Sequence, residues 1–325
     1  MARKPALEEM AGILELPVVD FSSLDRASTA KLIRQACLEY GFFYLVNHGI
    51  EEGLLGRVFE GSKNLFSLPL DEKMKMQRNE GHRGYTPPFA EKLDPSLPSK
   101  GDLKESFYIG PMEGNELQWL SNQWPSEEIL PYWRETMVLY YEKALSVGKI
   151  LTSLIALALD LEECFFEKIG ALHKPMAFLR LLHYPDSASG SIDGEFGASA
   201  HTDYGIVTLL ACDGVPGLQI CREKDEYPRV WEDVPHLDGA LVVNVGDLLE
   251  RWTNCLFRST LHRVLATGLE RYSIAFFLEP NSDCLVECLD SCRSEACPPR
   301  FPPVRSSDYL KERLRITYAS EEHQA

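Results

Sequence analysis

The chain has 325 residues, enough for one large catalytic domain or two small ones. It carries 33 basic and 49 acidic side chains, a net charge of −16, and this excess of negative charge argues against nucleic acid and anionic membrane surfaces as partners. No stretch is long and apolar enough to span a membrane, and the N-terminus lacks the apolar core of a signal peptide, so we expect a cytoplasmic protein.

Hydrophobic periodicity predicts helices at both ends of the chain and short strands between them. Apolar residues at helical spacing predict helices at residues 27–40, 54–68, 127–159 and 308–315. A buried strand is expected at 42–46, and residues 80–104, rich in Gly, Pro, Ser and Lys, are expected to form a long loop. From 178 to 277, short apolar stretches alternate with Gly- and Pro-bearing turns, which is typical of a β-sandwich or barrel.

The most informative pattern is His201-Thr-Asp203 with His262 further along the chain. Alternate side chains of a strand share a face, so His201 and Asp203 are expected to point the same way. A second strand carrying His262 can complete a set of two imidazoles and one carboxylate. Such a set holds Fe(II) and leaves positions open for substrate, cosubstrate and O2. A His-x-Asp pair alone is more often structural, so the prediction needs a second pattern beside it.

That second pattern is Arg271-Tyr-Ser273, which opens the apolar run 274–278. The run predicts a buried strand on which Arg271 and Ser273 share a face. A buried arginine is costly unless paired, and its planar fork suits a carboxylate held by two hydrogen bonds. Pairing of Arg271 with a structural Asp or Glu stays open as the alternative.

Together with these patterns, the chain resembles the plant-type 2-oxoglutarate- and Fe(II)-dependent dioxygenases of the isopenicillin N synthase-like superfamily. The resemblance covers most of the chain and rests on motifs in the family's order, at residues 16–21, 41–49, 84–88, 105–108, 122–125, 217–219, 243–250 and 258–264. It implies an α+β fold with a mainly β core, a double-stranded β-helix (jelly roll) with packed helices that forms a single catalytic unit. The expected parts are an N-terminal region at 1–120, scaffold helices at 121–175, the catalytic core at 176–300, and a C-terminal helix and tail at 301–325.

The resemblance also implies the cofactors and the residues that hold them. Fe(II), 2-oxoglutarate as cosubstrate and O2 are expected, with ascorbate as a candidate reductant, and the reaction releases succinate and CO2. The implied catalytic iron ligands are His201, Asp203 and His262. The residues implied to bind the distal carboxylate of 2-oxoglutarate are Arg271, Ser273 and Tyr184. Leu182 stands where the family often has an asparagine that supports the cosubstrate, so that contact is expected to be missing.

The expected partner is a small-molecule substrate, an aromatic or hormone-like metabolite such as a flavonoid, which a monomeric enzyme hydroxylates, desaturates or demethylates. Four residues are expected near the substrate, namely Phe277, Phe107, Tyr108 and Arg180. Each has a plainer alternative, because Phe and Tyr are commonly core residues and Arg180 could form a rim ion pair. The resemblance places the loop at 80–104 over the mouth of the site as a candidate lid.

Two alternative functions stay open. The protein could be a related Fe(II) oxidase that does not use 2-oxoglutarate, in which case Arg271 and Ser273 would bind a substrate carboxylate. It could also be a non-enzymatic binding protein for small molecules on the same fold. An intact metal triad beside a carboxylate clamp argues against the second alternative.

Nine cysteines without a secretion signal suggest free thiols in a reducing compartment. Four of them cluster near the C-terminus, at positions 284, 288, 292 and 297, but their spacing matches no common zinc pattern and ordinary thiols are expected. Among the polar residues near the motifs, Asn244 and Asp247 are expected to be structural. Arg258 and Arg263 cannot both share the strand face of His262, so supporting or surface roles are expected for them.

Overall fold

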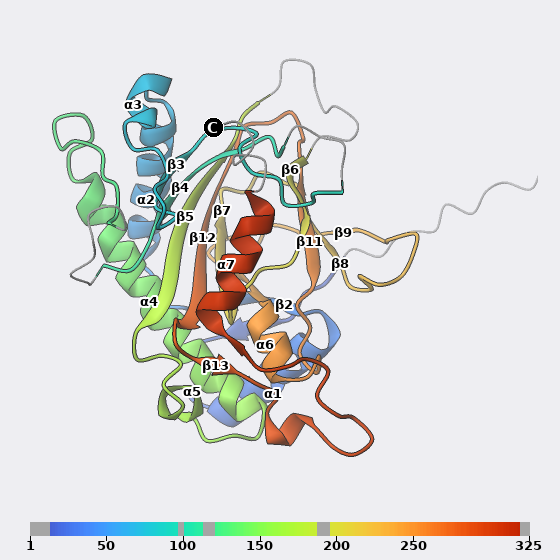
Figure 1. Ribbon diagram of the computed structural model, residues 1–325. Helices are drawn as coiled ribbons and strands as arrows, with labels where there is room; N and C mark the ends of the chain where they lie inside the picture. Colours follow the sequence, from blue (N-terminus) through green and yellow to red (C-terminus); the bar gives the residue numbers. More distant parts are fainter. Residues whose placement is uncertain (1–13, 97–100, 113–120, 187–195, 319–325) are drawn as a thin grey trace, which may run out of the picture.

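The computed structural model describes residues 14–96, 101–112, 121–186 and 196–318, in which a large and a small β-sheet face each other (Figure 1). The large sheet has the order β1-β2-β10-β7-β12-β5-β4-β3. Its strands are β1 (Val18–Asp20), β2 (Phe42–Val46), β3 (Gly84–Thr86), β4 (Glu105–Ile109), β5 (Pro175–Tyr184), β7 (Val207–Cys212), β10 (Leu241–Val245) and β12 (Arg271–Asn281). The small sheet has the order β6-β11-β8-β9, with β6 (Phe196–His201), β8 (Leu218–Cys221), β9 (Glu232–Asp233) and β11 (Leu261–Leu265).

Helices cover the outer face of the large sheet, while one C-terminal helix lies by the opening between the sheets (Figure 1). The covering helices are α1 (Arg26–Glu39), α2 (Glu52–Phe66) and α4 (Trp133–Ala158). The shorter ones are α3 (Leu70–Met74), α5 (Phe165–Lys168) and α6 (Asp247–Trp252). A two-stranded ribbon, β13 (Leu285–Val286) with β14 (Val304–Arg305), leads into α7 (Ser306–Thr317), which packs against β12.

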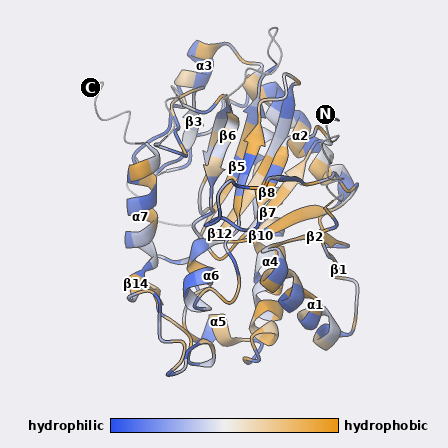
Figure 2. Ribbon diagram, turned by 90° about the vertical axis from the view of Figure 1, so that its right-hand side faces the viewer, coloured by the Kyte–Doolittle hydropathy of each residue, from blue (hydrophilic) through white to orange (hydrophobic). Residues whose placement is uncertain are grey.

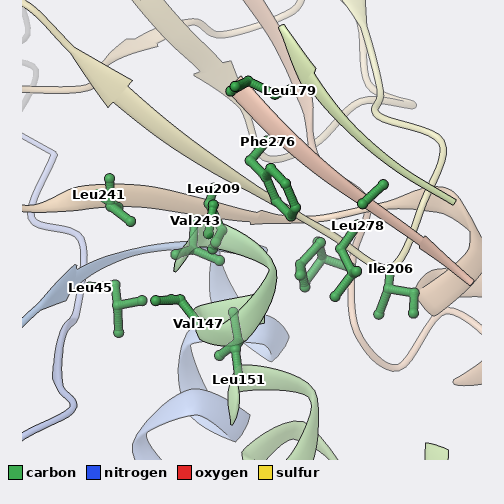
Figure 3. Packing of buried hydrophobic residues seen from close by; sticks show 14 of the residues in the cluster. Leu45, Val147, Leu151, Leu179, Ile206, Leu209, Leu241, Val243, Phe276 and Leu278 are labelled. Carbon is green, nitrogen blue, oxygen red and sulfur yellow. The ribbon is translucent and has the colours of Figure 1, made fainter. Parts of the chain in front are cut away.

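Alternate residues of β12 face opposite sides of the large sheet, one toward the helices and the other toward the small sheet. Tyr272, Ile274, Phe276 and Leu278 point toward the helices and belong to the larger of two hydrophobic clusters. Figure 3 shows Phe276 and Leu278 in this cluster with Val147 and Leu151 of α4. The residues between them, Arg271, Ser273, Ala275, Phe277 and Glu279, lie on the opposite face of the strand, toward the small sheet. The second cluster lies on this inner side, and in Figure 2 the central strands are mainly hydrophobic along their length.

The two facing sheets with packed helices confirm the double-stranded β-helix fold. The helices predicted at 27–40, 54–68, 127–159 and 308–315 are present as α1, α2, α4 and α7, each with somewhat different ends. Within the predicted loop at 80–104, the described residues 80–96 and 101–104 are mostly loop but contain β3, and residues 97–100 lie outside the described ranges. Strands β1 to β4 from the N-terminal region share one sheet with β5, β7, β10 and β12, and the division into four parts stays a prediction.

No helix in the described ranges is long and apolar enough to cross a membrane.

Candidate active site

The small sheet brings three metal-compatible side chains together. His201 ends β6 and Asp203 follows two residues later, while His262 lies on β11 directly opposite His201 in the antiparallel pairing. The Nε2 atoms of His201 and His262 each lie 3.7 Å from Oδ1 of Asp203. Within the described parts of the chain, these three residues are the one group of His, Cys, Asp or Glu side chains placed to share a metal ion.

Backbone carbonyls orient both imidazoles. Nδ1 of His201 lies 2.7 Å from the carbonyl oxygen of Ser199, and Nδ1 of His262 lies 3.1 Å from that of Thr260. Because a carbonyl oxygen only accepts hydrogen bonds, each Nδ1 carries the hydrogen and each Nε2 presents its lone pair. Burial lowers the pKa of His201 to about 4, and the nearby His262 adds to this effect, so the imidazole is neutral at pH 7, as a metal ligand must be.

Two strands of the large sheet orient the carboxylate. Oδ2 of Asp203 accepts hydrogen bonds from Thr208 Oγ1 on β7 at 2.6 Å and from Asn244 Nδ2 on β10 at 2.7 Å. Burial acts to raise the pKa of Asp203, but the two imidazoles and these hydrogen bonds outweigh it and hold the pKa below its ordinary value. The carboxylate is therefore ionised, and its Oδ1 is directed toward the two Nε2 atoms.

Asn244→Ala is expected to weaken Fe(II) binding about 10- to 100-fold, which is the usual effect of removing a partner that orients a metal ligand. The reason is that Asp203 loses one of the two donors that hold its carboxylate in place. Anaerobic equilibrium titration with Fe(II) measures the change. Asn64→Ala, at an exposed position of α2, is the matched control. Equal Fe(II) affinity in Asn244→Ala and the wild type would contradict this role.

Arg271 and Ser273, at the start of β12, form a pair of buried hydrogen-bond donors that we call the anion clamp. Arg271 is only 2% exposed; its Nε donates to the carbonyl of Val215 at 3.2 Å, and its Nη2 to Cys212 Sγ at 3.3 Å. Its Nη1 and the hydroxyl of the buried Ser273 have no hydrogen-bond partner. No Asp or Glu of the described residues forms an ion pair with Arg271, so the alternative of a structural carboxylate partner finds no support. Two unpartnered donors on one face of a buried strand fit an incoming carboxylate.

One cavity connects this clamp to the metal-compatible triad. Its lining contains the triad, the clamp residues Arg271 and Ser273, and Tyr184, whose ring lies 4.9 Å from the Arg271 guanidinium. Leu182 lies beside Ser273 in the β5–β12 pairing and presents an apolar side chain to the same cavity. The expected asparagine contact is therefore missing here. The residues present fit an iron ion at one end and the distal carboxylate of 2-oxoglutarate at the other.

A second pocket shares His201 and Asp203 with this cavity and extends to α7. Phe277 and Arg180 line both spaces, and Tyr108 lines the second pocket. Three of the four residues expected near the substrate therefore lie together. Arg180 is not free, however, because its Nη2 donates to Glu91 at 2.7 Å and to Ser106 at 3.0 Å. Arg180 therefore forms an ion pair, as the alternative to substrate contact stated, but the pair is buried and does not lie at the rim.

Phe107 lies elsewhere, and its position corrects the expectation that it contacts the substrate. It is fully buried in the cluster between the large sheet and the helices, and its ring packs edge-on against Trp133 of α4. Phe107 and Tyr108 are neighbours on β4, so their side chains point to opposite faces. Only one of the two can face the substrate pocket.

Sequence reasoning missed several residues of the site. Thr208 and Asn244 stand on apolar strands, where a buried polar residue is itself a signal of a partner. Glu279 lines the second pocket from the inner face of β12. Three residues of α7 also line this pocket, namely Leu310, Leu314 and Thr317, and nothing in their local pattern indicates it.

The remaining sequence expectations concern residues outside the site. Arg263 donates to Gln219 and stacks on Trp231, which is a supporting role, as expected. Asp247 accepts hydrogen bonds from Ser259 and Tyr309, which is a structural role.

All nine cysteines are free thiols. The four clustered near the C-terminus form no metal-compatible group in the described ranges.

Comparison with known families gives two matches that together span most of the chain. Residues 16–127 match the family described as the N-terminal region of non-haem dioxygenases in morphine synthesis. Residues 175–280 match the 2OG-Fe(II) oxygenase superfamily. The second match contains the triad and the anion clamp, and the first contains β1 to β4 of the large sheet.

Similar proteins come from plants and fungi. The kihadalactone A synthase of Citrus sinensis is 40% identical over 310 residues, covering 93% of this chain and 92% of that protein. The azadirone synthase of Melia azedarach is 39% identical over 322 residues, covering 96% of each. Among solved structures, a full-length Neurospora crassa protein in complex with α-ketoglutarate has a TM-score of 0.82 at 30% identity, covering 94% of this chain and 97% of that one. The chain therefore belongs to the 2OG-Fe(II) oxygenase superfamily and is a 2-oxoglutarate-dependent dioxygenase that uses Fe(II).

Proposed function

We propose that this dioxygenase oxidises a small, largely apolar, ring-bearing metabolite. In this proposal, the iron is held by His201, Asp203 and His262, and 2-oxoglutarate by Arg271, Ser273 and Tyr184. The observation that carries it is the pair of unpartnered donors, Arg271 Nη1 and Ser273 Oγ, in the same cavity as the triad. A buried guanidinium without a carboxylate is costly, and 2-oxoglutarate supplies the missing partner.

The clamp is prepared for one orientation of its anion. Val215 and Cys212 hold Nε and Nη2 of Arg271, which leaves Nη1 directed away from them. Together with the Ser273 hydroxyl, it presents two donors to one carboxylate. Because these donors are preorganised, little side-chain entropy is lost when the anion binds.

At the other end of the cavity, the triad binds the metal through three ligands and leaves room for the cosubstrate and O2. When bound, iron and 2-oxoglutarate supply the oxidising chemistry, with release of succinate and CO2. The protein orients the ligands through Ser199, Thr260, Thr208 and Asn244. Apolar side chains in the cavity lining, namely Phe42, Leu210, Leu218 and Val264, exclude water from the reacting groups.

The substrate class follows from the second pocket. Its lining is rich in aromatic and aliphatic side chains, namely Tyr108, Phe178, Tyr204, Phe277, Leu310 and Leu314. Such a lining favours a flat or compact apolar molecule over a peptide. The similar proteins support a small molecule but not one structure, since two are synthases of kihadalactone A and azadirone and a third is solved in complex with thymine. A flavonoid is one member of this class, and the C–H bond that the pocket presents decides between hydroxylation and desaturation.

The experiment that tests this function is an anaerobic titration of the Fe(II)-loaded protein with 2-oxoglutarate, followed by the metal-to-ligand charge-transfer band. We expect a band that saturates at one equivalent, because the clamp and the triad share one cavity. A screen of ring-bearing compounds by succinate release, with ascorbate as reductant, then identifies substrates. Iron binding without the band would instead favour the oxidase that does not use 2-oxoglutarate, and failure to bind iron would contradict the proposal.

A cytoplasmic, monomeric enzyme is part of the same proposal. Nine free thiols are compatible with a reducing compartment, which also keeps iron ferrous. Light scattering on the purified protein is expected to give a mass near 36.8 kDa. A stable dimer would contradict the monomer.

A further inference from the structure

Glu279 is a buried carboxyl group outside the residues proposed to hold iron and 2-oxoglutarate. It stands on the inner face of β12, two residues after Phe277, and is only 3% exposed. Its Oε2 is shielded from solvent and has no hydrogen-bond partner. It lines the second pocket beside His201 and Asp203. A buried carboxyl group without a hydrogen-bond partner destabilises the folded protein. A bound ligand that forms a hydrogen bond with Glu279 would account for its presence.

The backbone leaves a specific space for this carboxyl. A Cβ atom at Gly205 would lie 2.7 Å from Oε1 of Glu279 and 2.6 Å from the carbonyl oxygen of Leu278. Only glycine leaves room there, because any side chain at 205 would displace the acid or the strand. Burial raises the pKa of Glu279 to about 8, and the carboxylates of Asp203 and Asp247 act in the same direction. An uncharged carboxyl both donates and accepts hydrogen bonds.

The charges around the pocket disfavour an anionic substrate. Arg180 is the one arginine or lysine among the described residues that line it, and it is paired with Glu91 at 2.7 Å. The neighbouring Lys104 is paired in turn with Glu91 and with Asp102, both at 2.7 Å. These four buried residues contain two positive and two negative charges and leave no unpaired cation for a substrate carboxylate. A substrate carboxylate would therefore lose its hydration in this pocket without gaining an ionic partner.

We propose that Glu279 anchors the substrate by a hydrogen bond to a hydroxyl or carbonyl group, and that the pocket accepts uncharged molecules and rejects carboxylates. This inference rests on the proposed function, because it assigns a substrate class to the same site. The anchor lies on the same strand face as Phe277, so a ring packed on Phe277 and a polar group held by Glu279 would fix the orientation of one molecule. Glu279 is thereby a specificity-determining residue beside the iron ligands.

The test uses two substitutions and matched pairs of probes. The probes are indole-3-acetamide with indole-3-acetate, and methyl jasmonate with jasmonate, which differ in charge but share their rings. In the wild type, we expect 2-oxoglutarate-dependent succinate release to be stimulated by the uncharged member of a pair and not by the acid. Glu279→Leu should lower kcat/KM for the uncharged probe about 10- to 100-fold, as for a lost hydrogen bond in a buried site. Glu279→Gln, which keeps a donor and an acceptor, should stay within about threefold of the wild type.

Two further readouts separate this role from a structural one. The 2-oxoglutarate charge-transfer band of both variants should match that of the wild type. Absence of the band in the wild type itself would contradict the proposed function, and it would not bear on the role of Glu279. The thermal midpoint of Glu279→Leu should rise, because an unpartnered buried acid is removed. Glu295→Leu, at an exposed position, controls for the change of charge. A preference for the acid probes, equal use of both members, or wild-type kinetics with a lower midpoint in Glu279→Leu would each overturn the inference.

Discussion

Asp203→Ala is expected to abolish Fe(II) binding and all 2-oxoglutarate turnover. The substitution removes the one charged ligand and leaves two neutral imidazoles, which hold a divalent ion poorly. The loss should exceed the roughly 10- to 100-fold effect of removing an orienting partner such as Asn244. His201→Ala should act in the same way, because its Nε2 lies 3.7 Å from the same carboxylate oxygen. Metal analysis after anaerobic reconstitution, together with succinate release, measures both effects.

Two controls make this result specific. His236→Ala replaces a histidine outside the triad, whose Nε2 lies near Asp238, and should retain one equivalent of iron. Thermal unfolding should show that Asp203→Ala is folded, because Thr208 and Asn244 lose only a shared partner. An Asp203→Ala protein that binds iron and turns over at the wild-type rate would remove the triad from its proposed role.

Arg271→Ala is expected to weaken 2-oxoglutarate binding while leaving the iron site intact. Loss of a buried charge-assisted pair costs about 2–5 kcal/mol, which corresponds to roughly 30- to several-thousand-fold in Kd. Arg271→Lys should recover only part of the loss, because an ammonium group keeps the charge but not the planar fork. The titration that follows the charge-transfer band gives the affinity of each variant.

Arg263→Ala is the matched control for this experiment. Arg263 is also an arginine on a strand, in the small sheet, but its side chain bonds Gln219 and stacks on Trp231. Its removal should leave the 2-oxoglutarate affinity unchanged. If Arg271→Ala bound 2-oxoglutarate as tightly as the wild type, another residue would have to hold the distal carboxylate.

Much of the site is visible in the sequence because its key residues stand two positions apart. On β12, this spacing places Arg271 and Ser273 on one face, whereas His201 ends β6 and Asp203 follows it outside the strand. The same spacing extends from Arg271 and Ser273 to Phe277 and Glu279. Strand periodicity therefore identifies residues that can act together within one segment.

Strand periodicity cannot identify the neighbours that other segments supply. Phe107 and Tyr108 were both expected at the substrate, yet they face opposite sides of β4, and only the position of α4 shows which side is the core. Asn244 was expected to be structural, and the pairing of β7 with β10 instead places it on the Asp203 carboxylate beside Thr208. The register of β11 against β6 likewise sets His262 opposite His201.

By itself, the sequence determined the family, the fold class, the two side-chain patterns proposed to hold iron and 2-oxoglutarate, and the strand face that Arg271 and Ser273 share. The tertiary structure alone decided that Glu279 is buried without a partner, that Arg180 is neutralised by Glu91, and that α7 lines the second pocket. The physical reason is the distance along the chain over which each property is set. Side-chain direction follows from local backbone geometry, whereas burial and pairing depend on which distant segments pack against that face.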